Sequence, residues 1–185
     1  MRRVTSWLLA AAAVCALTSG TCSARVFQTR EQALREVFPE ADSIIPHDLF
    51  LTAAQREAVE RQSGAPLGTD FVTLYEARCK GRVLGVAALD VQQVRTMPQT
   101  LLVAVSPGGT VLKLVMCAFA EPDEYLPTIR WFRQFEGKTS GARLRVGGDV
   151  AAVAGCTLTS QAVARAVKRT LALSALLAPA AKGER

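Results

Sequence analysis

The chain has 185 residues, with 22 basic and 16 acidic side chains and a formal net charge of +6 at neutral pH. Half of its residues are hydrophobic, which is enough for a domain with a core of its own. The basic excess is spread along the chain and does not form a stripe with interleaved aromatic residues, so the sequence argues against a nucleic acid partner.

Residues 1–24 have the features of a secretory signal. Arg2 and Arg3 give a basic start, residues 7–17 form an apolar run, and small residues up to Ala24 provide a cleavage site. The apolar run is shorter than the roughly 20 residues that a membrane-spanning helix needs. We therefore expect an exported protein, in the periplasm or another extracytoplasmic space. A retained N-terminal anchor, which would associate the chain with a membrane, is the alternative.

Residues 25–69 are predicted to form a helical lead-in to the main domain. Apolar residues at helical spacing indicate helices at 29–38 and 52–62, and each begins at a threonine suited to capping. Between these helices, 44–45 and 49–51 have the composition of short extended pieces. We expect the two helices to pack on the main domain.

From residue 70 the pattern changes to that of strands. Four apolar stretches bounded by turn or loop residues predict strands at 71–79, 82–89, 101–105 and 110–119. Residues 96–99 are predicted to form a loop between the second and third of these strands. Strands joined by short connections favour an antiparallel sheet over alternating βαβ units. The predicted fold class is therefore α+β, with a mostly antiparallel sheet flanked by helices.

The rest of the main domain is predicted to be helical, with one long loop. Helical spacing returns at 124–135, and a polar, glycine-rich loop follows, with a short strand at 144–146. The final helix is expected over about 157–177. The main domain would then span 70–178, and 179–185 would form a tail.

The cysteines and the single histidine exclude several kinds of site. Cys79, Cys117 and Cys156 are far apart in the sequence and lack the spacing of a metal knuckle, so no metal site is expected. Cys79 and Cys117 lie in apolar strand patterns and suit buried positions; one disulfide, of undecided pairing, is also open. His47 is the only histidine and suits a structural or exposed role, which leaves a hydrolase pairing of Thr157 with His47 without a local signature.

Gly155 and Thr157 lie in a turn just ahead of the final predicted helix. Glycine allows the backbone to approach a ligand closely, and the free N–H groups of a first helical turn attract an anion such as phosphate. A hydroxyl at the same point also allows the phosphate to be bonded covalently. The other interpretation is an ordinary helix cap, which occurs in any fold.

This turn resembles the flavin-attachment motif of the FMN-binding domain family, the domain of NADH:quinone and Rnf-type electron-transfer subunits. That motif reads aspartate, two variable residues, serine or threonine, glycine, alanine and threonine, usually followed by a variable residue and Thr-Ser. Four residues match it, namely Gly155, Thr157, Thr159 and Ser160. In that family a flavin transferase links FMN through its phosphate to the last threonine of the core motif. The resemblance therefore implies FMN at Thr157.

Three positions depart from that motif. Ala151 stands in place of the aspartate, Ala154 in place of the hydroxyl residue, and Cys156 in place of the alanine. A transferase that reads the aspartate or the hydroxyl would leave Thr157 unmodified. The departures favour an alternative, a non-redox accessory or binding protein of the same fold that has lost covalent flavin attachment.

Further short motifs follow the order found in the family, and the resemblance covers about residues 70–173. They include Glu121-Pro122, Tyr125 and Gly137-Lys138. The resemblance implies that Glu121 contacts the flavin ring and that Tyr125 stacks on it. The alternative for Glu121 is the start of a helix, where negative charge is favoured.

The function expected from the sequence is that of an exported FMN-binding protein that carries electrons outside the cytoplasm, rather than an enzyme with its own substrate pocket. The residues expected to hold the cofactor are Gly155, Cys156, Thr157, Thr159, Ser160 and Glu121. The flavin would supply the redox chemistry and the protein would bind and orient it. The expected partners are a membrane electron-transfer complex or another redox partner, and a flavin transferase where attachment is covalent.

Overall fold

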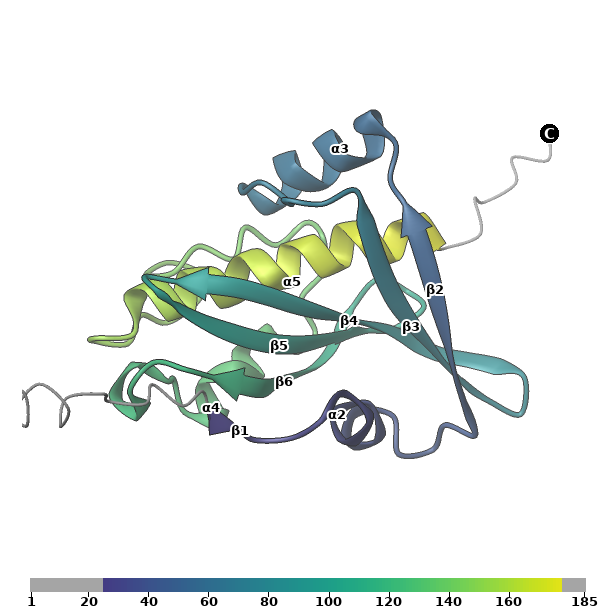
Figure 1. Cartoon of the computed structure of the whole chain (residues 1–185), viewed down its shortest axis with the longest axis horizontal. Coiled ribbons are helices and arrows are strands. Elements are labelled where there is room, and N and C mark those ends of the chain that lie inside the picture. The colour runs from purple at the N-terminus through teal and green to yellow at the C-terminus, as the bar shows by residue number, and fades with distance from the viewer. Residues whose placement is uncertain (1–24, 178–185) are drawn as a thin grey trace, which may run out of the picture.

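One antiparallel sheet organises residues 25–177, the part of the chain that this computed structural model describes (Figure 1). Its six strands lie in the order β1-β6-β5-β4-β3-β2, and every neighbouring pair is antiparallel. The strands are β1 Arg25–Val26, β2 Ser43–Phe50, β3 Phe71–Cys79, β4 Arg82–Val94, β5 Met97–Val105 and β6 Val111–Phe119. The predicted α+β class with an antiparallel sheet is confirmed. The predicted signal at 1–24 and the tail at 179–185 lie outside the described residues.

Four α-helices and two short 3₁₀ helices complete the described part. The α-helices are α2 Arg30–Val37, α3 Ala53–Ser63, α4 Ile129–Phe132 and α5 Thr157–Leu177. The 3₁₀ helices are η1 Asp123–Tyr125 and η2 Arg133–Phe135. No helix among the described residues is long and apolar enough to cross a membrane.

Helices cover both faces of the central strands. Along β5, Leu101 and Val103 pack in a cluster with α4, η2 and α5, whereas Leu102 and Ala104 pack in a second cluster with α2. Successive side chains of a strand point to opposite faces, so this division follows directly from the sequence. Burial on both faces explains why β5 is almost continuously apolar.

The N-terminal segment completes the sheet, and its description as a helical lead-in is not supported. The two predicted helices are present, each opened by a capping box in which Thr29 or Thr52 bonds the third residue of its helix. The segment also provides β1 and β2, the two edges of the sheet. The extended pieces predicted around Pro46 join into one strand, because an edge strand tolerates a proline that has no N–H to donate.

Three local predictions in the main domain differ from the structure. The loop expected at 96–99 is a tight hairpin, because Arg95 takes a positive φ of 51° and lets β5 begin at Met97. The helix expected at 124–135 is broken into η1, α4 and η2. The short strand expected at 144–146 amounts to one isolated bridge between Val146 and Val150.

Strands β3 and β4 separate part-way along their length. Their pairing runs from Cys79 and Arg82 to Leu74 and Ala88 and stops there. Beyond that point β3 continues beside β2, and β4 continues beside β5 to Val94. Figure 1 shows β3 rising toward α3 while β4 runs toward the start of α5. The sheet is therefore split on the side that α3 and α5 cover.

Candidate functional site

The turn ahead of α5 has the geometry that the sequence predicts for an anion site. Gly155 has a φ of 81°, a conformation that favours glycine. Cys156 donates its N–H to the Val153 carbonyl at 3.1 Å and accepts the first helical hydrogen bond, from Ser160 N–H, at 2.8 Å. The N–H groups of the first helical turn have no acceptor within the helix. They are available to a phosphate.

Thr157 is the first residue of α5 and not its cap. The residue is exposed, and its hydroxyl makes no hydrogen bond within the described residues 25–177. An ordinary capping threonine precedes the first helical residue and accepts a backbone N–H, as Thr29 and Thr52 do in this chain. The ordinary cap interpretation therefore does not hold for Thr157. Its hydroxyl is accessible for modification.

The loop after β6 lies against this turn. Cys156 is buried, and its thiol lies 3.4 Å from the Glu124 carbonyl oxygen. The same oxygen lies 4.0 Å from the position that a Cβ on Gly155 would take. Burial raises the pKa of the Cys156 thiol, so the group is neutral near pH 7. The structure thus brings together the Glu121 to Tyr125 loop and the threonine turn, which are separated in the sequence.

Glu121 is buried and holds a cation at the same end of the sheet. Its two carboxylate oxygens lie 3.3 and 3.2 Å from Arg95 Nη1, and the Arg95 guanidinium carbon lies 4.3 Å from the centre of the Tyr125 ring. The Glu121 side chain is 4% exposed and that of Arg95 is 42% exposed. Glu121 therefore pairs with a neighbouring cation instead of starting a helix, since η1 begins at Asp123.

Sequence reasoning missed Arg95. The residue directly precedes the loop predicted at 96–99, and nothing in a single sequence marks a non-glycine residue for a positive φ. Two features could have pointed to it. One is an arginine between two apolar strands, and the other is Glu121, which needs a positive partner once it is buried.

The other polar residues of the motif face inward. Thr159 and Ser160 are 1% and 0% exposed, and Ser160 Oγ is buried without a hydrogen-bond partner in the described residues. Their predicted role as cofactor contacts stays a prediction. An orphaned hydroxyl in the first turn of α5 is a group that a bound polar ligand would satisfy.

Two hydrogen bonds fix the backbone at Ala151, where the family motif has an aspartate. At Ala151 the backbone N–H donates to Gln134 Oε1 at 2.7 Å, and the carbonyl accepts from Trp131 Nε1 at 2.7 Å. Side chains from the α4 and η2 region therefore fix the strand-like approach to the turn. Ala154 is exposed and adds no polar group.

Comparison with known proteins shows what this part of the chain is similar to. Residues 97–172 match the FMN-binding domain. The match runs from β5 to α5 and contains the Glu121 loop and the Gly155 to Thr157 turn. The resemblance indicated by the sequence is confirmed, and the family indicates FMN as the cofactor.

A solved structure shares the fold. NqrC from Shewanella oneidensis superimposes with a TM-score of 0.52 at 16% sequence identity, over 78% of this chain and 84% of that one. At this identity the likeness concerns the fold alone. A search of curated proteins finds no match.

The residues of the FMN-binding domain fit its cofactor. Glycine at 155 permits close approach, the first turn of α5 offers N–H groups, Thr157 offers an exposed hydroxyl, and Arg95 adds positive charge at the edge of the site. Arg95 is partly neutralised by Glu121, so the N–H groups are the main anion donors.

The described residues offer no competing metal or nucleophile site. They contain no cluster of three or more histidine, cysteine or acidic side chains that could hold a metal ion. Cys79, Cys117 and Cys156 are all free thiols, so no disulfide joins them. His47 lies on β2, at the far edge of the sheet, 3.9 Å from Glu76 Oε2, and is not near Thr157 as a hydrolase would require.

Proposed function

We propose that this protein is an exported electron carrier that holds FMN through its phosphate at Thr157. The observation that carries the proposal is the exposed, unbonded hydroxyl of Thr157 at the first position of α5, two residues after a glycine in the left-handed conformation. A phosphate placed there meets backbone N–H donors and the positive end of a helix of 21 residues.

The Arg95, Glu121 and Tyr125 cluster would orient the cofactor beside the turn. Glu121 holds the Arg95 side chain in place, and the Arg95 guanidinium stacks over the Tyr125 ring. A fixed cation next to a flavin favours negative charge on the ring, which raises its reduction potential. Bound FMN supplies the electron-accepting and electron-donating chemistry. Arg95 raises the reduction potential of the flavin, and the Cys156 thiol stays neutral.

Export gives a physical reason for covalent attachment. A cofactor held only by equilibrium binding is lost to a dilute medium, whereas a phosphoester bond prevents that loss. The basic and apolar pattern of residues 1–24 supports export, and a membrane electron-transfer complex is the partner that such a carrier would serve. A flavin transferase would make the bond.

A second candidate function is a non-redox accessory protein of the same fold. It is favoured by Ala151, Ala154 and Cys156, which depart from the family motif at positions that a transferase reads. The hydrogen bonds at Ala151 argue against it, because they hold the backbone ahead of the turn without an aspartate at this position.

The test is production of the full chain with a flavin transferase, followed by denaturing electrophoresis with in-gel flavin fluorescence. Native chain and Thr157→Ser should fluoresce, because both carry a hydroxyl, whereas Thr157→Val should not. Thr128→Ala is the matched control, since Thr128 is an exposed threonine at a helix start whose side chain makes no capping bond. Flavin released on denaturation indicates a reversible binder, and no flavin of either kind supports the accessory protein.

A further inference from the structure

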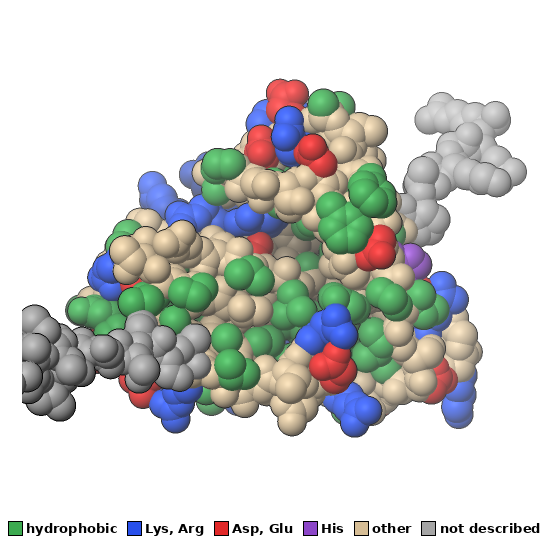
Figure 2. All heavy atoms as spheres, in the orientation of Figure 1, with side chains coloured by type: hydrophobic (Ala, Val, Ile, Leu, Met, Phe, Trp, Pro, Cys, Tyr) green, Lys and Arg blue, Asp and Glu red, His purple; other side chains and the backbone are tan. Residues whose placement is uncertain are grey.

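The split between β3 and β4 opens a cavity that is remote from the threonine turn. It has a volume of about 350 Å³ and lies between the diverging strands, with α5 at its base and the loop after α3 as its roof. Figure 2 shows the surface hollowed between α3 and the sheet, with an acidic group inside the hollow and basic groups along its rim. This volume is at the low end of the range for small-molecule sites.

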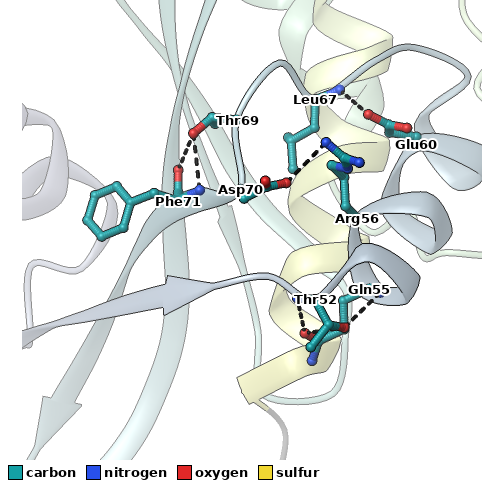
Figure 3. A network of polar contacts seen from close by, with 8 residues as sticks. All are labelled: Thr52, Gln55, Arg56, Glu60, Leu67, Thr69, Asp70 and Phe71. Carbon is teal, nitrogen blue, oxygen red and sulfur yellow. Dashed lines mark hydrogen bonds and ion pairs between the residues drawn. The ribbon is translucent and has the colours of Figure 1, made fainter.

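The roof of the cavity is fixed by a polar network (Figure 3). Arg56 on α3 pairs with Asp70 at 3.2 Å, and Glu60 on α3 accepts the N–H of Leu67 at 2.9 Å. Thr69 Oγ1 accepts the N–H of Phe71 at 3.0 Å, where β3 begins. The roof is therefore held to α3 at two points, and the separation of the strands is a built feature of the fold.

A buried ion pair lies at the base of the cavity. Asp90 on β4 and Arg169 on α5 are 7% and 8% exposed, and Asp90 Oδ2 lies 3.1 Å from Arg169 Nε. The approach is close, yet Arg169 Nε meets no acceptor in hydrogen-bonding geometry, and Asp90 Oδ1 has no partner either. Thr170, which is fully buried and also lines the cavity, leaves its Oγ1 without a hydrogen bond in the described residues.

Burying these groups costs folding free energy unless their unpaired donor and acceptor atoms gain hydrogen-bond partners. A buried ion pair is favourable only when additional hydrogen bonds meet the remaining donors and acceptors. Burial is the main influence on Asp90 and raises the pKa of its carboxyl, with Arg169, Gln92 and Arg165 opposing it. The carboxylate therefore lacks enough positive partners, and a donor delivered from the cavity would supply one.

The walls above the ion pair are largely apolar. Leu67 from the roof, Val72 from β3 and Leu173 from α5 pack together and line the space next to Asp90 and Arg169. Phe71 is 43% exposed at the mouth and contacts Phe50, with ring centres 5.0 Å apart. A ligand that fits this cavity would therefore have a head group with both a positive and a negative charge, and an apolar group that packs on these walls.

We infer that this cavity binds a small zwitterion with an apolar side group, the chemistry of a free α-amino acid such as leucine. The ligand's ammonium pairs with Asp90, its carboxylate pairs with Arg169, and its side group packs on Leu67, Val72 and Leu173. One charge of each sign leaves no uncompensated charge in the pocket. Arg169 lies twelve residues after Thr157 on α5, roughly 18 Å along the helix axis, so this site is separate from the phosphate site.

The experiment is isothermal titration of the full chain with L-leucine and L-phenylalanine. N-acetyl-L-leucine, which lacks the ammonium, and L-leucinamide, which lacks the carboxylate, serve as ligand controls. We expect saturable binding of one amino acid per chain, weakened about tenfold or more in each control, because each leaves one buried charge unpaired. No binding of either amino acid, or a control that binds as tightly as L-leucine, overturns the inference.

Two kinds of variant locate the site. Leu67→Trp fills the cavity from its half-buried roof without touching the ion pair, and should abolish binding while the chain remains folded by circular dichroism. Phe50→Ser is the matched control, since Phe50 is 79% exposed and does not line the cavity. Unchanged binding in Leu67→Trp also overturns the inference. Asp90→Asn and Arg169→Gln should lose binding wherever they fold.

Discussion

Removing either partner of the Arg95 and Glu121 pair should destabilise the fold, and by unequal amounts. Arg95→Ala leaves the buried Glu121 carboxylate without its cation, which costs about 2 kcal/mol for a lost charged hydrogen bond. Removing one partner of a fully buried ion pair costs more free energy, but water reaches this pair from the side of the half-exposed Arg95. Glu121→Gln leaves Arg95 hydrated and still stacked on Tyr125, so it should cost less than about 1 kcal/mol.

Thermal unfolding followed by circular dichroism measures the difference. For a chain of this size, 1 kcal/mol corresponds to roughly 2–4 °C in Tm. Arg95→Ala should therefore lower Tm by roughly 4–8 °C and Glu121→Gln by roughly 4 °C at most. Arg82→Ala is the control, because Arg82 is an exposed arginine beside a hairpin turn with no ion pair among the described residues. Equal losses for the two variants, or a neutral Arg95→Ala, would refute the assigned roles.

Three further predictions test other parts of the structure. Gly155→Ala should lower the free energy of unfolding by about 1–2 kcal/mol in urea titration through its left-handed φ alone, because a Cβ there meets nothing closer than 4.0 Å; a neutral result contradicts the turn geometry. Gly85→Ala should be more damaging, since its Cβ would lie 2.6 Å from the Val105 carbonyl oxygen, and a fold of unchanged stability would show that β4 and β5 are not packed as described. Burial raises the pKa of the Cys117 and Cys156 thiols, so iodoacetamide at pH 8 should label half-buried Cys79 first, as read by mass spectrometry; faster labelling of Cys117 would contradict its burial.

The sequence predicts the elements whose pattern is local. Thr29 and Thr52 open helices as expected, and the alternation of Leu101, Leu102 and Val103 between two clusters follows from strand periodicity. The threonine turn also lies where its glycine and the following helical pattern indicate.

Features that depend on distant packing were beyond the sequence. Pro46 predicts an interruption of the strand, yet an edge strand tolerates a proline. Only the strand order shows that β2 is an edge strand. Arg95 meets Glu121 through a hairpin that no glycine marks. Asp90 and Arg169 meet only because α5 crosses the strands where β3 and β4 part.

Attachment of FMN at Thr157 is the central claim, and the mass of one peptide tests it most directly. Trypsin cleavage after Arg145 and Arg165 isolates residues 146–165, which contain Thr157 along with Thr159 and Ser160. The chain should be made with a flavin transferase, and the peptide fragmented to locate the added mass. The account predicts FMN less one water, carried by Thr157. An unmodified peptide, or the addition on Thr159 or Ser160, would contradict it.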